Sequence, residues 1–378
     1  MTELVVGGAS LTMLDFAEEL AAEHEVVIAH GHLDDPANAA VRRARARFPS
    51  YELPRLARPL EPRADLLAMR AFAALCRHVR PDVIHTHSSK AGFIGRLVAP
   101  PEAAIRFHTI HGWGHTPLDP PLRRRLLIDA ERLAARRTTK LVAVSSEVRD
   151  EGLALRIGRP AQYAVIGAPV DMRPLGSRDF DAARARARAS LELPRDAEVV
   201  GWVGRFSAQK DPDALVKVLT RLLRRHNAYA VLVGDGPARA AVQQRLGTEI
   251  AERRVRITGL RSDVRALYAA FDVLLHTSAW EGHPRVVREA LAERVPVVTA
   301  RVGGTGVVSS DPALGAEVEA GDVAAYCAAL EAILDAPDRR APIDERALAS
   351  LRSSADEPYR LMRELYATSL AHASHQPP

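Results

Sequence analysis

Short apolar runs alternate with longer stretches of helical period along most of the chain. The runs are rich in Val, Ile and Leu, as expected of buried parallel strands. The predicted strands are Val26–Ala29, Asp82–His85, Leu141–Ser145, Val199–Val203, Ala230–Val233, Val255–Thr258, Val273–His276 and Val295–Thr299. The predicted helices are Leu11–Ala22, Ala64–Val79, Pro121–Ala135, Asp213–Arg225, Val264–Ala270 and Arg285–Ala292. This alternation predicts an α/β protein whose parallel sheets carry helices on both faces.

The alternation breaks once, in a polar stretch with Pro and Gly at Ala168–Phe180, and then restarts. A chain of 378 residues is too long for one ordinary core. The sequence therefore predicts two Rossmann-like domains, each with a doubly wound parallel sheet, that face a cleft. The first covers residues 1–170 and the second residues 171–355. Residues 356–378 are expected to form a C-terminal helix that packs back toward the first domain, and a frayed tail.

Composition indicates a soluble globular protein. Hydrophobic residues make up 47% and charged residues 26% of the chain, which argues against disorder. No apolar run reaches the ~18–20 residues of a membrane span, and the start of the chain lacks the pattern of a signal peptide. Cys76 and Cys327 lie in apolar, helix-like surroundings and are expected to be reduced core residues. These features predict a cytoplasmic location.

The net charge is +5, and nearly all of the basic charge is arginine, with basic clusters at Arg42–Arg47 and Arg123–Arg125. Solvated surface explains the clusters, and attraction to phosphates, anionic lipid headgroups or an acidic acceptor is the functional alternative. No nucleic-acid partner is expected, because no binding motif is recognisable and aromatic residues make up only 5%. In residues 115–127, apolar and basic side chains occur together. This segment fits a weak peripheral contact at the inner membrane face and equally an ordinary helix start.

Two loops that follow predicted strands of the second domain carry candidate ligand-binding residues. In GWVGRFSAQKD, Arg205 and Lys210 come after a strand and before a helix, where two cations suit a diphosphate. An exposed basic loop explains them equally well. In LVGDGP, Gly234 and Gly236 permit positive φ and a close approach of the backbone to a ligand, although many strand–helix turns share this pattern.

Two glutamates occur at the predicted helix Arg285–Ala292. Glu281 lies in a turn before it, and Glu289 lies eight residues further on, inside it. Eight residues of helix span ~12 Å, which is comparable to the reach from the ribose to the sugar ring of a nucleotide sugar. Backbone N–H groups near Gly282 and His283 would be free to bind phosphate or sugar oxygens. A solvated helix face explains Glu289 if it is taken alone.

In this order and spacing, these segments resemble the retaining glycosyltransferases of family 4, which have the two-domain GT-B fold. GRFSAQKD resembles the G-R-x-x-x-x-K donor-phosphate loop of that family, and EGHPRVVRE matches its E-x7-E motif. TGLRSDVRALYAAFDVLLHTS is similar to the segment that members place against the base. HTHSSKAGFIGRL, HTIHGWG and ERLAARRTTKLVAVSS resemble segments of the first domain, so that the resemblance spans roughly residues 4–335.

The resemblance implies a role for each matching residue of the second domain. Arg205 and Lys210 would hold the diphosphate and stabilise the leaving group, so neither a metal ion nor a cofactor is expected. Glu289 would bind the ribose. Glu281 would contact the transferred sugar, and the donor-binding set also includes Gly234, Gly282 and His283.

For the first domain, the resemblance implies that Gly8 approaches the phosphates from its glycine turn. It places His111 across the cleft, at the reacting centre. His85, His87 and His108 stay structural or undecided. The implied reaction moves a sugar, with retention, from a nucleotide-sugar donor, UDP-linked by resemblance, to a hydroxyl of an acceptor. Neither the acceptor nor the oligomeric state follows from the sequence.

Three features depart from the family pattern. After Glu-Gly the family commonly has Phe or Leu and then Pro-Asn, where this chain has His283, Pro284 and Arg285. The segment Gly303–Val308 lacks the acidic residue that usually follows its glycines. Only six residues precede Gly7, so the first strand of the N-terminal domain is expected to be short or missing. The alternatives are therefore a catalytically weak nucleotide-sugar-binding or partner subunit, or an epimerase or phosphorylase of the same fold.

Overall fold

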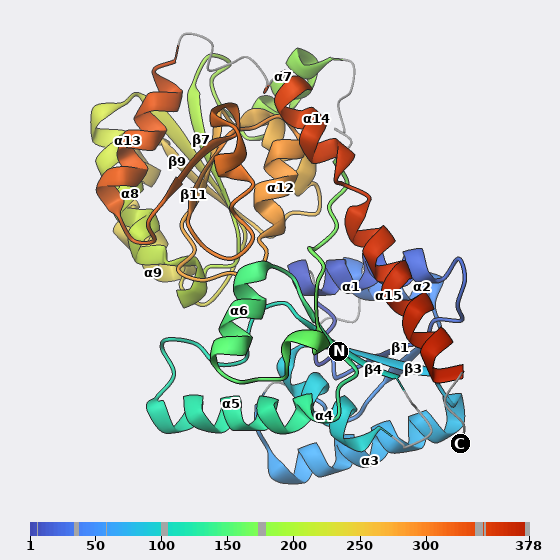
Figure 1. The fold of residues 1–378 in the computed structure, drawn as a ribbon. Helices are drawn as coiled ribbons and strands as arrows, with labels where there is room; N and C mark the ends of the chain where they lie inside the picture. The colour runs from blue at the N-terminus through green and yellow to red at the C-terminus, as the bar shows by residue number, and fades with distance from the viewer. Residues whose placement is uncertain are drawn as a thin grey trace. The chain divides into compact units, whose positions relative to one another are not determined.

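The structure is a computed structural model that describes residues 1–5, 7–33, 38–57, 59–99, 105–172, 179–336, 343 and 345–374. The chain divides into two compact units, each of which combines parallel strands with helices (Figure 1). Unit 1 comprises Met1–Pro169 and Asp356–Pro378, and unit 2 comprises Val170–Ala355. The division falls inside the polar stretch Ala168–Phe180, of which residues 173–178 lie outside the described part.

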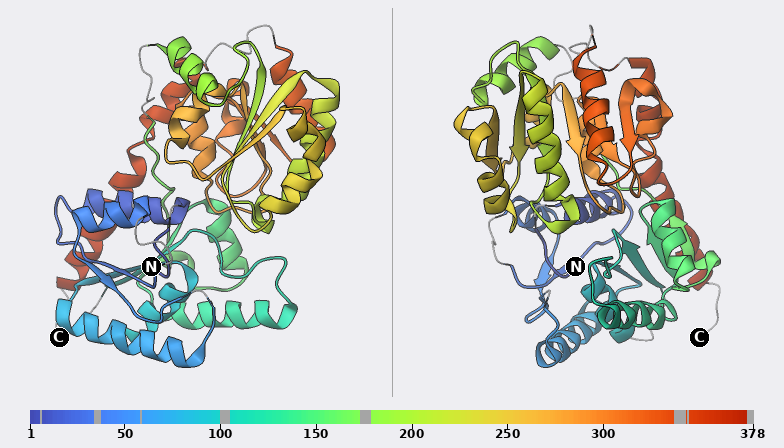
Figure 2. Two further views of the ribbon diagram at one scale, coloured as in Figure 1. Left: turned by 180° about the vertical axis from the view of Figure 1, so that it is seen from behind. Right: turned by 90° about the vertical axis from the view of Figure 1, so that its left-hand side faces the viewer.

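Unit 2 contains a six-stranded parallel sheet with helices on both faces (Figure 2). Its strands are β7 (Glu198–Val203), β8 (Ala228–Val233), β9 (Val255–Gly259), β10 (Val273–His276), β11 (Val297–Ala300) and β12 (Gly315–Val318). Its helices are α7 (Phe180–Ser190), α8 (Pro212–Arg225), α9 (Arg239–Arg245), α10 (Gly247–Ala251), α11 (Val264–Leu267), α12 (Arg285–Ala292), α13 (Val323–Leu334) and α14 (Glu345–Ser353). Short 3-10 turns are η2 (Ala208–Lys210), η3 (Tyr268–Ala270), η4 (Val308–Ser310) and η5 (Pro312–Leu314).

Both faces of this sheet are buried. Neighbouring residues of one strand, such as Leu274 and Leu275, belong to two different apolar clusters. Because successive strand residues point to opposite faces, one cluster lies on each side of the sheet. This explains why the strands read as continuous apolar runs rather than as alternating patterns.

The strand order of unit 2 is β12-β11-β10-β7-β8-β9, and it reverses at β7. After β7 the chain adds β8 and β9 on one side, and then β10, β11 and β12 on the other. The loops that leave β7 and β10 therefore turn to opposite faces of the sheet. Such a switch point is where open parallel sheets bind their ligands.

Unit 1 holds a four-stranded parallel sheet, β3-β4-β5-β6, and a separate parallel pair, β1-β2. The strands are β1 (Ile28–His30), β2 (Ser50–Glu52), β3 (Val83–His87), β4 (Ile105–Ile110), β5 (Lys140–Ala143) and β6 (Tyr163–Val165). The helices are α1 (Gly8–Leu20), α2 (Ala39–Arg47), α3 (Pro62–Val79), α4 (Ser89–Val98), α5 (Pro121–Ala135), α6 (Ser146–Ala154) and α15 (Glu357–Ser374), with the turn η1 (Pro160–Gln162). No helix in the described part of the chain is both long and apolar enough to cross a membrane.

The segment ahead of α1 takes no part in a strand within the described residues. The amino group of Met1 donates to the Ala29 carbonyl at 2.8 Å, and its own carbonyl accepts from the Gly31 N–H at 3.1 Å. The Thr2 N–H donates to Ser88 Oγ at 3.0 Å, just beyond β3. This segment thus contacts β1 and the residue that follows β3 without forming a strand, which agrees with the short or missing first strand that the sequence predicts.

Helix α15 completes the core of unit 1. Met362 and Tyr366 are buried against Phe16 of α1 and Phe107 of β4. The Tyr366 hydroxyl also lies 2.8 Å from His85 Nδ1. Residues that follow unit 2 in the sequence therefore belong structurally to unit 1.

A buried ion-pair network ties α7 to the sheet of unit 2. Asp272, directly before β10, accepts from Arg184 at 2.5 Å and from Arg188 at 2.9 Å. It also accepts from the Val199 N–H of β7 at 2.7 Å, and its side chain is 0% exposed. Arg188 additionally donates to the Ala270 carbonyl at 3.2 Å. The carboxylate of Asp272 is therefore the counter-charge of both buried guanidinium groups.

We expect Asp272→Ala to lower the free energy of unfolding by about 3–5 kcal/mol, because it leaves buried guanidinium groups without their counter-charge. The matched control is Asp263→Ala, which removes the partner of Arg261 in a pair at 2.7 Å nearer the surface. That change should cost no more than about 1 kcal/mol. Urea denaturation followed by circular dichroism measures both, and equal losses would contradict the role of the network.

Candidate active site

The residues predicted for the donor site in unit 2 follow β7, β8 and β10, three strands that are neighbours in the sheet. Because these strands are parallel, their carboxyl ends lie at the same edge. The loops after β7 and β10 flank the switch point, the place at which open parallel sheets usually bind a ligand. The sheet therefore brings together residues that are far apart in the sequence.

Lys210 and Glu281 form an ion pair at this edge. Lys210 Nζ lies 2.5 Å from Glu281 Oε1, and the two side chains are only 16% and 11% exposed. The loops that carry them are joined through their backbones: the Ala279 N–H donates to the Gln209 carbonyl at 2.9 Å, and Thr277 Oγ1 donates to the Lys210 carbonyl at 2.8 Å. The pair is thus held in place from both strands.

The Glu281 carboxylate is ionised at neutral pH. Burial alone raises the pKa of Glu281, but Lys210 and His276 outweigh burial and lower this pKa to about 2. Ser278 Oγ donates to Oε1 at 2.8 Å, and Gln209 Nε2 donates to Oε2 at 3.2 Å. Neither Ser278 nor Gln209 was predicted as a site residue, although both stand in the loops that the motifs had identified.

Arg205 is exposed on the loop after β7, which the loop after β8 supports. A Cβ atom at Gly234, where φ is +138°, would lie 1.9 Å from the Gly204 carbonyl oxygen. A Cβ atom at Gly236, where φ is +153°, would lie 2.5 Å from the Phe206 carbonyl oxygen. Only glycine allows this contact. Both glycines therefore have a packing role that positions the loop of Arg205, independent of any ligand.

Glu289 makes specific contacts within unit 2. The Tyr268 hydroxyl donates to Glu289 Oε2 at 3.2 Å, and Arg285 Nε lies 3.5 Å from Oε1. Burial and the nearby Glu289 charge raise the pKa of Tyr268, which therefore stays a donor. Tyr268 lies in the segment that resembles the base-binding part of the family. The contact was not visible in the sequence, because it joins η3 to α12.

The helix between the two glutamates is shorter than the spacing estimate assumed. Pro284 is the N-cap residue of α12, and the helix begins at Arg285. Only the second half of the interval from Glu281 to Glu289 is helical, so the estimate of ~12 Å for eight helical residues does not apply.

Gly282 is buried, and the loop that it shares with His283 packs against the later glycine segment. A Cβ atom at Gly304, where φ is +76°, would lie 2.8 Å from His283 Cδ2. Burial, helped by Arg288 and Arg285, lowers the pKa of His283 to about 3, so its ring is neutral. Within the described residues, the buried Nδ1 atom of His283 has no hydrogen-bond partner. Such an atom is rare in a native core and marks this ring as a candidate ligand contact.

Gly8 and His111 belong to unit 1. Gly8 is the first residue of α1, directly after the N-cap Gly7, so its N–H is among those at the helix start that the helix leaves unpaired. His111 follows β4, and its Nε2 atom lies 3.0 Å from Nδ1 of His87, the last residue of β3. The two rings are stacked with centroids 5.3 Å apart.

His87 is the functional candidate that the sequence left undecided. Burial, and next the neighbouring His85 and His111, lower the pKa of His87 well below its ordinary value. A neutral imidazole has one N–H and one bare nitrogen, so its hydrogen bond with His111 selects the tautomer of His87. The histidine-rich segments HTH and HTIH were the available signal in the sequence, although a strand was predicted only for the first of them.

No group of three or more His, Cys, Asp or Glu side chains among the described residues is arranged to hold a metal ion. The positive charge of the unit 2 site comes from Lys210 and Arg205. The arrangement provides cations and an ionised carboxylate at a switch point, together with a second carboxylate on the following helix. These groups suit a ligand that carries both phosphates and hydroxyls.

Two family models match most of the chain. The family model for Glycosyltransferase Family 4 matches residues 6–173, and the model for Glycosyl transferases group 1 matches residues 197–336. The UDP-Gal:alpha-D-GlcNAc-diphosphoundecaprenol alpha-1,3-galactosyltransferase of Escherichia coli is 24% identical over 291 residues, which cover 76% of this chain and 75% of that protein. A D-inositol 3-phosphate glycosyltransferase of Corynebacterium kroppenstedtii is 26% identical over 330 residues, with 80% and 70% covered.

Solved structures with the same fold cover nearly all of the chain. HepE of Anabaena, in complex with UDP and glucose, aligns with a TM-score of 0.77 and 21% identity over 97% of this chain and 96% of that one. The sucrose-phosphate synthase of Thermosynechococcus elongatus aligns with a TM-score of 0.80 and 22% identity over 97% and 94%. The chain has the GT-B fold and belongs to the glycosyltransferases of family 4.

Proposed function

We propose that this glycosyltransferase moves a sugar from a UDP-linked donor to a hydroxyl of an acceptor, with retention at the anomeric carbon and without a metal ion. The observation that carries the proposal is the Lys210–Glu281 pair at the switch point of the unit 2 sheet. The relative from Escherichia coli is named for UDP-Gal, and solved HepE structures hold UDP or UDP-glucose. These names support a UDP-linked donor for this chain.

Departure of the nucleoside diphosphate is the step that the cations of the site assist. Negative charge develops on the leaving phosphate, and a fixed cation that is already desolvated stabilises it more than water does. Lys210 uses one of its three donors for Glu281 and keeps the others for phosphate oxygens. Arg205 adds a planar guanidinium that suits bidentate contact with a phosphate. These two cations supply the charge that a metal ion would otherwise provide.

Glu281 and Glu289 are assigned to the two sugars of the donor. Glu281 is ionised and accepts hydrogen bonds, so it suits the hydroxyls of the transferred sugar while it also fixes Lys210. Glu289, oriented by Tyr268, suits the hydroxyls of the ribose. His283 presents a neutral ring with a free nitrogen beside Glu281, and Gly8 and His111 complete the proposed set from unit 1.

The proposed location of this reaction is the cytoplasm. Both cysteines, Cys76 and Cys327, are buried and free. Reduced, buried thiols are typical of proteins that work in a reducing compartment.

We expect Glu281→Gln to lower turnover at least tenfold and to leave UDP affinity nearly unchanged, because the change removes a charge beside the sugar and keeps the size of the side chain. Glu289→Ala should instead weaken UDP binding by about tenfold, roughly 1.4 kcal/mol, through loss of the ribose contact. Mass spectrometry of donor consumption across UDP- and GDP-sugars measures turnover, and titration calorimetry measures UDP binding.

The matched control is Glu252→Gln, a change at an exposed glutamate of unit 2. If Glu281→Gln and Glu289→Ala both behave like this control, the site assignment fails. If the unaltered protein binds UDP tightly but consumes none of the UDP- and GDP-sugars of the panel, the result would favour the alternative of a nucleotide-sugar-binding subunit.

His87 is expected to act as a positioning residue for His111. Asparagine places a polar atom where His87 Nδ1 lies, whereas glutamine places it nearer the position of Nε2. His87→Asn should therefore keep most of kcat, and His87→Gln and His87→Leu should lower kcat about tenfold or more with little change in the KM for the donor. Steady-state kinetics test this, with circular dichroism to verify folding. Equal kcat losses in all three variants would show that His87 acts only in packing.

A further inference from the structure

We propose that unit 1 carries a docking surface for an anionic phospholipid bilayer, formed by the outer side of α5 and the adjoining loop at residues 155–162. This inference goes beyond the proposed function and does not depend on it. It rests on the leucines that α5 exposes to solvent and on the arginines that lie beside them.

Helix α5 carries apolar side chains both on the inner side that packs against unit 1 and on the outer side that faces solvent. Its inner side packs through Ile128, Ala134 and Ala135, which are all less than 9% exposed. Glu131 on the same side accepts a hydrogen bond from the fully buried Arg96 of α4 at 2.8 Å. The inner side alone is therefore sufficient to hold α5 in the core.

The outer side of α5 exposes leucines to solvent. Leu122 is 73% exposed, Leu126 is 62% exposed and Leu133 is 48% exposed, and Leu118 just before the helix is 65% exposed. Separations of four and seven residues place the three helical leucines on one stripe, because a helix repeats every 3.6 residues. A contiguous row of exposed leucines is uncommon on a protein surface and marks a site of contact.

Arginines line the same side of the helix. Arg125, Arg132 and Arg136 are spaced by seven and four residues, so they form a second stripe beside the leucines. Asp129 lies between the stripes and pairs with Arg125 at 3.4 Å and with Arg132 at 2.7 Å. One carboxylate thus serves two guanidinium groups, and the stripe keeps a net positive charge.

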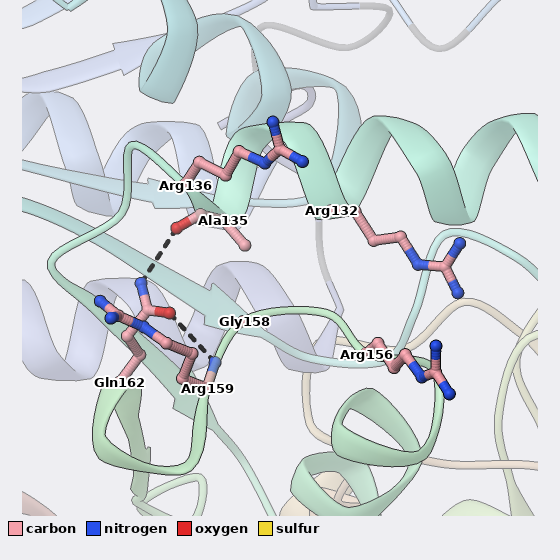
Figure 3. Close-up of a pocket in the computed structure, with 7 residues that line it drawn as sticks. All are labelled: Arg132, Ala135, Arg136, Arg156, Gly158, Arg159 and Gln162. Carbon is pink, nitrogen blue, oxygen red and sulfur yellow. Dashed lines mark hydrogen bonds between the residues drawn. The ribbon is translucent and has the colours of Figure 1, made fainter.

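A pocket continues this charge beyond the end of α5. It is lined by Arg132 and Arg136 from the helix and by Arg156 and Arg159 from the loop after α6 (Figure 3). The side chains of Arg132 and Arg156 extend in the same direction, one from each segment (Figure 3). Across the described part of the chain, the side chains of Arg136, Arg156 and Arg159 take part in no ion pair. Their charge is available to an anionic partner.

Hydrogen bonds join the loop to the helix as one surface. Gln162 Nε2 donates to the Ala135 carbonyl at 3.0 Å, and Gln162 Oε1 accepts from the Arg159 N–H at 3.0 Å (Figure 3). Arg132 Nε donates to the Leu155 carbonyl at 2.9 Å. The leucine stripe, the arginine stripe and the pocket therefore keep a constant arrangement.

Charge decides which occupant this surface fits. A second copy of the chain would bring arginines against arginines, which costs free energy. The interface of an anionic bilayer provides phosphates for the guanidinium groups and, directly below them, an apolar layer for the leucines. A row of leucines flanked by arginines has the composition of helices that lie in such an interface.

Co-sedimentation of the whole chain with vesicles tests the proposal. We expect binding to vesicles made of equal parts phosphatidylcholine and phosphatidylglycerol, and at least about tenfold weaker binding to vesicles of phosphatidylcholine alone. The triple change Leu122→Gln, Leu126→Gln and Leu133→Gln should lower the affinity for anionic vesicles by at least about tenfold. The triple change of Arg136, Arg156 and Arg159 to Ala should do the same and should reduce the dependence of binding on salt.

Two controls match these variants on unit 2. Leu260→Gln removes a leucine that is 78% exposed, and the change of Arg221, Arg224 and Arg225 to Ala removes three exposed arginines from one helix. Both should bind like the unaltered chain, and circular dichroism should show the same melting temperature for all four variants, because all the altered side chains lie at the surface. Donor consumption is measured separately, so a failure of the proposed transfer reaction is distinguishable from a failure here.

Three results would overturn the proposal. The first is that the unaltered chain pellets no better with anionic vesicles than without them. The second is that the surface variants of α5 and the loop bind as well as their controls. The third is a dimer in sedimentation velocity that the leucine changes dissociate, which would assign the leucine stripe to a second copy of the chain.

Discussion

The ion pair between Lys210 and Glu281 is the contact on which the proposed donor site of unit 2 depends. Its two members stand in loops that follow different strands, and only the placement of β7 next to β10 brings them together. The pair lowers the pKa of Glu281 despite its burial and holds the Lys210 ammonium at the switch point. The charge state of Glu281 and the position of Lys210 at the carboxyl edge of the sheet therefore follow from one structural constraint, the reversal of strand order.

Glycines let the surrounding loops reach this position. The backbone of the Arg205 loop packs against Gly234 and Gly236 so closely that a Cβ atom at either position would clash with it. His283 packs against Gly304 in the same way. Gly234 was predicted from its likeness to ligand-binding turns. The structure adds a physical reason that needs no ligand, since the loop that carries the cations rests on it.

The two units use buried polar groups in a similar manner. In unit 1 the ends of β3 and β4 bring His87 next to His111, as the ends of β7 and β10 bring Lys210 next to Glu281. In both places a polar contact at the carboxyl edge of a parallel sheet orients the residue to which chemistry is assigned. The outer side of α5 differs from both places, because it exposes leucines to solvent. Packing against the core uses only the inner side of the helix.

The sequence by itself indicated many of the elements, the family and the loops that carry the candidate site. Apolar periodicity identified eight strands and six helices, because buried parallel strands and amphipathic helices leave local patterns. It missed β4, where Arg106 and Thr109 interrupt the apolar run, and it missed the short β2, β6 and β12. Only the tertiary structure decided which strands are neighbours, that Tyr268 contacts Glu289, and that the leucines of α5 face solvent. These features depend on contacts between residues distant in sequence, which no local pattern records.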